Sequence, residues 1–85
     1  MFYYVYVLKS EKDNSIYIGY TNDLRRRLKE HNELKNISTK NRAPFRLIYY
    51  EAYKARSDAR YRENNLKRFA KAYNQLKKRI KNSLI

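Results

Sequence analysis

The stretch from Tyr17 to Leu28 constrains this chain most, because its pattern changes from strand to basic helix just after the only glycine among 85 residues. Its first residues are aromatic and aliphatic, which is typical of a β-strand. Gly19 then permits close backbone packing or a bulge at the strand end, or it leaves room for a phosphate to approach the backbone. Residues 21–23 are Thr, Asn and Asp, which cap helix N-termini. A strand–turn–helix unit is therefore predicted.

The helix that follows combines one apolar stripe with a run of three arginines. On a helical wheel Arg27 borders the stripe, so it is predicted to lean toward the sheet. An arginine in that place either snorkels to solvent or serves a site. Arg25 and Arg26 are predicted to face solvent. His31, one turn after Arg27, is either a structural hydrogen-bonding residue or part of a site. The stripe consists of Leu24, Leu28 and His31.

A β-hairpin is predicted at the start of the chain. Residues 2–8 are all aliphatic or aromatic, which is typical of a strand buried on both faces of a sheet. Polar turn formers at 11–14 separate it from a second strand at 15–20. With a loop of two or four residues, opposed residues have numbers that sum to an odd value, so Tyr6 and Tyr17 share one face. A three-residue loop or a bulge would separate them.

A polar segment and a third strand follow the basic helix. Residues 33–43 are polar, and a surface loop there would bring Thr39, Lys40 and Arg42 within reach of phosphate. Residues 45–53 are rich in aromatic and aliphatic side chains and predict the third strand.

From about residue 57 the pattern becomes helical and continues into a basic C-terminal segment. Glu63 lies inside the apolar stripe of this helix, where an unpaired carboxylate would be costly. It therefore either pairs with a nearby lysine or arginine or binds a metal ion, and the pattern favours neither. A break in the helix is expected near residues 69–73. The stripe consists of Ala59, Glu63, Leu66, Ala70 and Tyr73.

Positive charge dominates the composition, since 21 Lys and Arg against 8 Asp and Glu give a formal net charge of +13. Such an excess favours a polyanionic partner, nucleic acid first and an anionic membrane surface second. The chain has no cysteine, which excludes a disulfide, a thiolate metal site and a cysteine nucleophile and fits a cytoplasmic location. No apolar run approaches the roughly 20 residues of a membrane span. At 85 residues, one small domain with a modest core is expected.

Together these residues resemble the GIY-YIG nuclease superfamily. The likeness consists of Tyr4-Val5-Tyr6, Tyr17-Ile18-Gly19, Arg27 and a later helix with Glu63, from about Tyr3 to Lys67. It is closest to small stand-alone bacterial members related to the endonuclease domain of the excinuclease C subunit. Tyr4 departs from the pattern, because the family name has glycine there. The resemblance implies an α/β (α+β) fold with a small three-stranded antiparallel sheet flanked by helices. A single domain, 1–85, is expected, with a core at about 3–67 and a basic helical extension at 68–85.

The resemblance also implies hydrolysis of phosphodiester bonds with Mg²⁺ or Mn²⁺. Either Tyr6 or Tyr17 is the general base; Tyr6 is favoured, with Tyr17 as its orienting partner. Because the reference pKa of tyrosine is about 10, this role requires nearby cations to lower the pKa. The resemblance assigns catalytic roles to Tyr6, Tyr17, Arg27, His31 and Glu63, with Glu63 as the metal ligand. Candidate nucleic-acid contacts are Gly19, Arg25, Arg26, Lys40 and Arg42.

The sequence therefore predicts a metal-dependent DNA endonuclease that acts in DNA repair or in processing of branched DNA. The alternative is a non-catalytic nucleic-acid-binding module that keeps the fold, and a weaker one is an RNA- or ribosome-associated basic protein. DNA is the expected partner, a membrane is not, and a separate protein that targets the nuclease is a further candidate. The oligomeric state, the preferred DNA and the pathway stay open.

Overall fold

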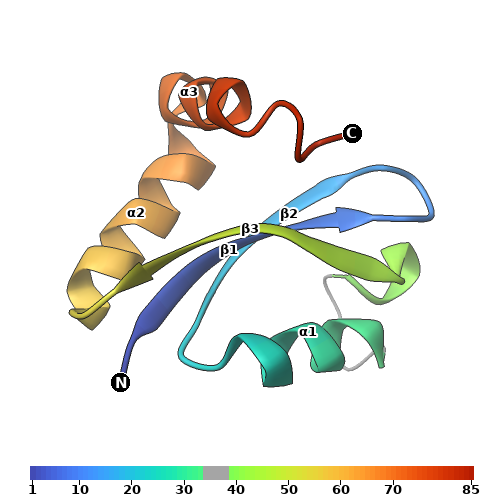
Figure 1. The fold of residues 1–85 in the computed structure, drawn as a ribbon, viewed down its shortest axis with the longest axis horizontal. Helices are drawn as coiled ribbons and strands as arrows, with labels where there is room; N and C mark the ends of the chain where they lie inside the picture. Colours follow the sequence, from blue (N-terminus) through green and yellow to red (C-terminus); the bar gives the residue numbers. More distant parts are fainter. Residues whose placement is uncertain (34–38) are drawn as a thin grey trace.

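A three-stranded antiparallel sheet with helices on both faces forms the body of the protein, in a computed structural model that describes residues 1–33 and 39–85 (Figure 1). The elements in chain order are β1 (Tyr3–Ser10), β2 (Ile16–Thr21), α1 (Leu24–Asn32), a short 3₁₀ helix (Lys40–Arg42), β3 (Phe45–Tyr53), α2 (Arg56–Arg68) and α3 (Ala70–Arg79). Helix α1 covers one face of the sheet, and α2 and α3 cover the other (Figure 1). The predicted α+β fold is confirmed.

Strand β1 is the centre of the sheet, in the order β2–β1–β3, and both neighbours run antiparallel to it. Its residues from Val5 to Leu8 are all buried, because helices cover both faces of this strand. This burial is what the uninterrupted apolar pattern predicted. The register of β1 with β3 shifts between Val7 and Leu8, where β3 carries one extra residue.

The β1–β2 hairpin has the register that brings two tyrosines to one face. Leu8 lies opposite Tyr17, and Tyr6, two residues earlier, lies opposite Gly19. Residues 11–14 form the loop, so it has the four residues that the odd-sum register requires. Because side chains alternate between faces along a strand, Tyr6 and Tyr17 both point toward α1. The prediction that they share a face is confirmed.

The two faces of the sheet bury separate hydrophobic clusters. The α1 face is built around aromatic side chains, with the apolar stripe of α1 packed against them; it contains Tyr6, Leu8, Phe45, Leu24 and Leu28. The opposite face is mostly aliphatic at its centre; it contains Val5, Val7, Ala59, Leu66, Leu76 and Ile80.

The long C-terminal helix is broken at Phe69, where the backbone is extended (φ −118°, ψ 113°), as the sequence predicted. The break turns α3 across the sheet face, so Leu76 and Ile80 enter the core while Ala70 remains exposed. Two expectations are therefore wrong. The single continuous stripe ends at the break, and the packed core does not stop at residue 67, because α3 supplies part of it.

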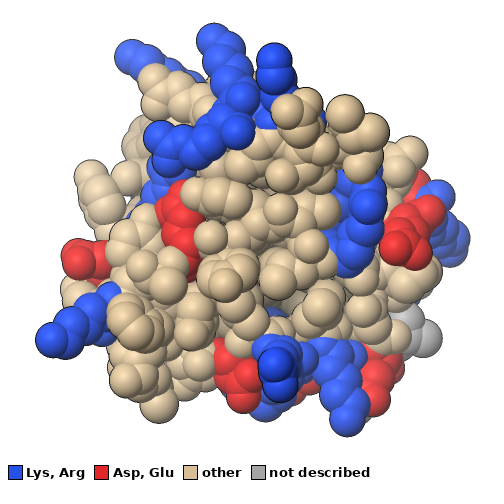
Figure 2. Space-filling view, viewed as in Figure 1, with Lys and Arg blue, Asp and Glu red and all other residues tan. Residues whose placement is uncertain are grey.

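Basic side chains are not spread evenly over the molecule. On the face seen in Figure 2 they gather over α3 at the top and around α1 at the bottom, while the middle carries little charge. Over the described residues, no helix has the length and apolar character needed to cross a membrane.

Candidate active site

Tyr6 is held against the backbone of Gly19, its partner across the hairpin. Its side chain is 1% exposed. A Cβ atom added to Gly19 would lie 2.3 Å from the Tyr6 hydroxyl, so any side chain there would displace the ring. The Tyr6 side chain thus occupies the space beside Gly19, which favours the close-packing role of this glycine. Contact between Gly19 and nucleic acid stays a prediction.

A buried chain of hydrogen bonds links Tyr6 to His31 and Thr39. The Tyr6 hydroxyl lies 3.0 Å from Nε2 of His31, and Nδ1 of His31 lies 2.7 Å from Oγ1 of Thr39. His31 and Thr39 are both 0% exposed. Burial, aided by the positive charge of Arg27, lowers the pKa of His31 to about 4, so the imidazole is neutral at physiological pH. Thr39 is therefore a buried partner of His31, and its predicted surface contact with phosphate is wrong.

The pKa of Tyr6 is raised, whereas a tyrosine that acts as a base in its ionised form needs a lowered pKa. Burial raises this pKa to about 12, and the Arg27 guanidinium beside the hydroxyl opposes that rise only in part. The expectation that nearby cations would lower the Tyr6 pKa is wrong, because desolvation of the phenolate outweighs them. Tyr6 is protonated at neutral pH, and any base function must move its proton elsewhere.

Tyr17 lies next to both of these groups on the α1 face. Its ring centroid is 6.3 Å from that of Tyr6 and 4.9 Å from that of His31, with the imidazole edge-on to the phenol. Phe45 packs against His31 from another side, at 5.9 Å. Unlike Tyr6, Tyr17 is only partly buried. The aromatic rings thus fix the imidazole plane while one phenol stays accessible from outside.

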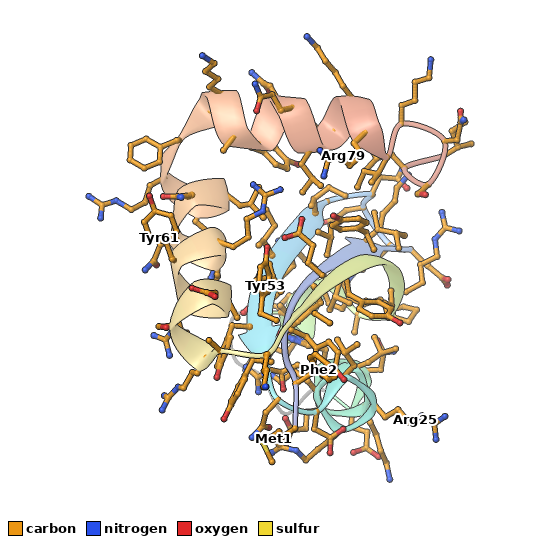
Figure 3. The ribbon with its side chains drawn as sticks, turned by 60° about the vertical axis from the view of Figure 1, so that its left-hand side comes forward. Met1, Phe2, Arg25, Tyr53, Tyr61 and Arg79 are labelled. Atoms are coloured by element: carbon orange, nitrogen blue, oxygen red, sulfur yellow. The ribbon has the colours of Figure 1, made fainter. Side chains whose placement is uncertain are left out.

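Arg27 leans toward the sheet, as its place on the helical wheel predicted. Its side chain is 32% exposed, pairs with Glu30 at 3.1 Å and reaches the Tyr6 hydroxyl. Arg25 and Arg26 are exposed, which confirms the predicted division of the three arginines. In Figure 3 the side chain of Arg25 points away from the body of the protein. Helix α1 therefore sends one guanidinium into the site and two toward solvent.

Glu63 approaches the site from the opposite face of the sheet, on α2. Its side chain is only 13% exposed and pairs with Lys67 at 3.0 Å and with Arg60 at 3.8 Å. The Lys67 ammonium also lies over the Tyr17 ring, 5.8 Å from its centroid. The ion-pair alternative for Glu63 is thus present, and the same Lys67 ammonium contacts both this carboxylate and the Tyr17 ring.

The other predicted contacts with nucleic acid lie around this centre. Lys40 is exposed on the 3₁₀ helix. Arg42 lines a hollow of about 350 Å³ together with Tyr17 and Lys67. The structure therefore brings Arg42, but not Arg25, to the immediate neighbourhood of the catalytic candidates.

Two further residues complete the cluster: sequence reasoning missed Lys67 and gave Thr39 a different role. Lys67 follows Glu63 by four residues, and that helical spacing of opposite charges is a signal that could have identified it. Thr39 carries no such signal, because only the fold brings it to His31. Within the described residues, no group of three or more His, Asp or Glu converges as a metal cage would.

Comparisons with known proteins show the family to which this chain is similar. Residues 2–78 match the family model described as the GIY-YIG catalytic domain. A UPF0213 protein of Staphylococcus haemolyticus is 41% identical over 70 residues, 81% of this chain and 84% of that protein. An archaeal UPF0213 protein, from Haloquadratum walsbyi, is 36% identical over 75 residues, 87% of this chain and 83% of its own. The solution NMR structure of a UPF0213 protein from Bacillus halodurans is similar, with 37% identity and a TM-score of 0.56 over 89% of this chain and 82% of that one.

Proposed function

The chain belongs to the GIY-YIG nuclease family, and on that premise we propose that it is a divalent-metal-dependent DNA endonuclease. One observation carries the proposal: Tyr6, Tyr17, Arg27 and His31 form one cluster, and Lys67 connects Glu63 to it. A centre built on phosphate contacts reads the DNA backbone rather than the bases. The proposal therefore places the enzyme in DNA repair or in processing of branched DNA, with the DNA's shape as the recognised feature.

Tyr6 acts by relaying a proton to His31. In the imidazole tautomer with a proton on Nδ1, that proton is donated to Thr39 and Nε2 accepts the hydroxyl proton of Tyr6. The attacking water gives its proton to the Tyr6 oxygen while the Tyr6 proton passes to Nε2. The raised pKa of Tyr6 is then no obstacle, because free tyrosinate never forms. The lowered pKa of His31 leaves Nε2 unprotonated at neutral pH, and it also makes the imidazole a weak base, so the protonated His31 exists only briefly.

Arg27 controls access to the relay and stabilises charge. Gly19, His31 and Arg27 enclose the Tyr6 hydroxyl, so water reaches it when Arg27 turns from Tyr6 toward a phosphate. The guanidinium then donates to phosphoryl oxygens whose negative charge grows in the transition state. Its ion pair with Glu30 keeps the Arg27 side chain extended beside the Tyr6 hydroxyl.

Glu63 is the residue that would hold the metal ion. A carboxylate oxygen suits Mg²⁺ or Mn²⁺, and one protein carboxylate with water and a substrate phosphate is a common set of ligands. When bound, the ion polarises the phosphate and neutralises charge on the leaving oxygen. Glu63 now has Lys67 and Arg60 as partners, so metal binding requires it to exchange at least one of them. Arg25, Arg26, Lys40, Arg42 and Gly19 are the proposed contacts along the DNA.

The proposal is tested by incubating the protein with end-labelled branched, flapped, single-stranded and plain duplex DNA in Mg²⁺, in Mn²⁺ and in chelator. Metal-dependent nicking is expected. Arg27→Ala is expected to reduce the cleavage rate about 100- to 1,000-fold, the usual cost of losing a donor to the developing charge. Glu63→Gln is expected to abolish metal-dependent cleavage. Matched controls are Arg46→Ala and Glu11→Gln, which alter exposed residues outside the cluster.

The second candidate, a non-catalytic binding module, has one observation in its favour. Both ion-pair partners of Glu63 are already in place, as expected for a purely structural carboxylate. Binding to the same DNAs without cutting in either metal, unchanged in Glu63→Gln, would establish the binding module. It would make Glu63 a structural residue.

A further inference from the structure

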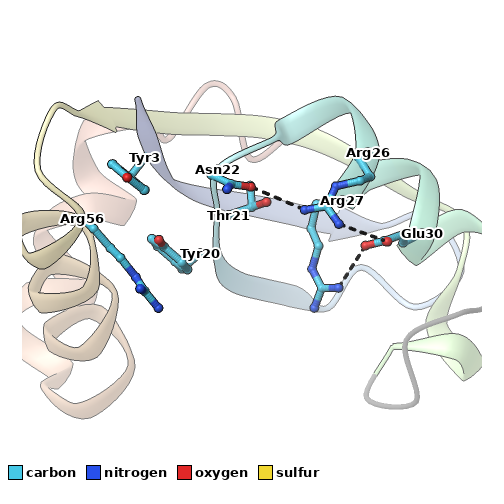
Figure 4. A pocket seen from close by; sticks show the side chains of 8 residues that line it. All are labelled: Tyr3, Tyr20, Thr21, Asn22, Arg26, Arg27, Glu30 and Arg56. Atoms are coloured by element: carbon cyan, nitrogen blue, oxygen red, sulfur yellow. Dashed lines mark hydrogen bonds and ion pairs between the residues drawn. The ribbon is translucent and has the colours of Figure 1, made fainter. Parts of the chain in front are cut away.

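We infer that the hollow between the start of α2 and helix α1 binds a second phosphate of the substrate strand, distinct from the cleaved one, and that Arg56 is its main ligand. The inference rests on the proposed function and assigns a substrate subsite to it. The hollow has a volume of about 440 Å³ and a mainly polar lining, with arginines on both sides (Figure 4).

The balance of charge in the hollow favours an anion. Arg26, Arg27 and Arg56 line it against one carboxylate, Glu30. Glu30 pairs with Arg26 at 3.6 Å and with Arg27 at 3.1 Å. Arg56 has neither an ion pair nor a hydrogen bond to any residue that the structure describes. One guanidinium is therefore left at the hollow with its donors unused, and its planar fork matches phosphate oxygens.

The aromatic side of the hollow indicates phosphate rather than a base. The Tyr20 ring is stacked on Tyr3, with centroids 6.4 Å apart and planes 6° from parallel. The Arg60 guanidinium lies over the same ring, 5.1 Å from its centroid. Tyr20 is thus engaged with protein partners, so the hollow offers charge and hydrogen bonds rather than a free ring for stacking.

The hollow continues directly from the catalytic cluster, because Arg27 belongs to both. Arg27 lines the hollow and also lies beside the Tyr6 hydroxyl. In Figure 4 the side chains of Arg56 and Arg27 extend in the same direction from opposite sides of the hollow. A strand whose cleaved phosphate meets Arg27 would therefore carry another phosphate to Arg56.

The test replaces one phosphate at a time in a flapped DNA with a neutral methylphosphonate and measures binding in chelator by fluorescence anisotropy. One position other than the cleaved bond is expected to weaken wild-type binding about tenfold, as for loss of a charged hydrogen bond. Arg56→Gln is expected to weaken binding of unmodified DNA similarly, to become insensitive at that position, and to lower the salt slope by about one. Arg56→Lys keeps the positive charge but not the planar guanidinium, so its affinity for DNA should lie between those of the wild type and Arg56→Gln.

The matched control is Arg68→Gln, an exposed arginine at the other end of α2 that does not line the hollow. It should keep full sensitivity at the same position. Sensitivity retained at every position by Arg56→Gln, or no binding of these DNAs by the wild type, overturns the inference. If the DNA is cut but Arg56→Gln changes the sensitivity at no phosphate position, the subsite is excluded and the proposed nuclease stands. If Arg56→Gln abolishes the sensitivity at one position but the DNA is never cut, the nuclease is excluded and the phosphate site stands.

Discussion

The two faces of the sheet bury different kinds of side chain. Beneath α2 and α3 the centre is aliphatic, formed by residues such as Val7, Leu66 and Leu76. Beneath α1 the buried set includes a phenol, an imidazole and a hydroxyl joined by hydrogen bonds, Tyr6, His31 and Thr39. No buried side-chain polar atom of the described residues lacks a hydrogen-bond partner. The α2–α3 face is thus a mainly apolar, stabilising face, whereas the α1 face buries a polar network that is tolerated because its members are hydrogen-bonded.

A cation–π contact links the two faces past the edge strand β2, because the Lys67 ammonium on α2 lies over the Tyr17 ring. Glu63 is on α2, yet its partner Lys67 lies over Tyr17, whose side chain belongs to the α1 face. An ion pair holds α2 to the sheet, with Arg62 Nε 2.9 Å from Glu51 on β3. The stabilising face therefore positions one catalytic candidate for the other face. The following changes test this division, in decreasing order of their expected consequence.

Tyr6→Phe removes the relay hydroxyl and keeps the ring. The cleavage rate is expected to fall about 100- to 10,000-fold, the usual contribution of a positioned acid–base group. The free energy of unfolding should fall by about 1–3 kcal/mol, because the buried Nε2 of His31 loses its hydrogen-bond partner. Nicking assays and urea denaturation of the same sample measure both. A rate within threefold of wild type would exclude Tyr6 from the chemistry.

Leu76→Ala, on the α2–α3 face, should have the opposite effect: a loss of stability without a loss of activity. Truncating this 2%-exposed side chain should lower the free energy of unfolding by about 2–5 kcal/mol. Because Leu76 belongs to the hydrophobic cluster beneath α2 and α3, away from the Tyr6 hydroxyl, the cleavage rate per folded molecule should stay unchanged. Denaturation curves give the folded fraction by which activity is normalised. A normalised rate that also collapses would show that the two faces are not separable.

Lowering the pH should destabilise the α1 face first. His31 has a pKa of about 4 when folded and about 6.5 when unfolded, so the unfolded state takes up the proton first. Stability is therefore full above about pH 6.5 and falls by up to about 3 kcal/mol as the pH drops to 4. The pKa of Glu51, on the other face, is lowered because Arg62 and two tyrosines outweigh its burial, so its contribution is lost only at more acid pH.

His31→Gln separates these two contributions, because it removes the titrating imidazole and leaves Glu51 intact. Its unfolding free energy, measured by denaturation at each pH, should be flat between pH 6.5 and 5. A variant that still loses stability across that range would assign the effect to another group.

Gly19→Ala tests how tightly the chemical face is packed. The added methyl group would meet the Tyr6 ring, and overpacking of this kind costs about 1–3 kcal/mol of stability. The Tyr6 hydroxyl should also shift from His31, so the cleavage rate should fall by more than the loss of folded protein explains. Ala52→Gly, at an exposed strand position, is the control for backbone flexibility. An unaffected Gly19→Ala enzyme would contradict the packing role.

Lys67→Met is expected to have the smallest effect, on metal affinity. Removing the ammonium 3.0 Å from Glu63 frees the carboxylate, so Mn²⁺ should bind several-fold more tightly. Electron paramagnetic resonance measures free Mn²⁺ without requiring cleavage. Lys71→Met, an exposed lysine on α3 beyond the break at Phe69, is the control. Equal or weaker Mn²⁺ binding by Lys67→Met would mean that the ion pair does not compete with the metal.

Strand and helix patterns predicted the elements and the faces of their side chains. The spacing of Leu24 and Leu28 was enough to place Arg27 toward the sheet, whereas Tyr6 and Tyr17 share a face only because the hairpin loop has four residues. The patterns were enough for these predictions because strand and helix periodicities are local properties of the chain. The break near Phe69 was also readable.

Only the tertiary structure decided how the groups are coupled. The hydrogen bond between His31 and Thr39 forms because the chain brings Thr39 back to α1, and no helix or strand periodicity predicts that contact. The pKa of Tyr6 depends on how deeply β1 is covered, and the sign of its shift follows from burial rather than from nearby charge. The entry of α3 into the core depends on the direction of the turn at Phe69. Distances across elements and exclusion of water arise only when the whole chain packs, and these set the chemistry of the site.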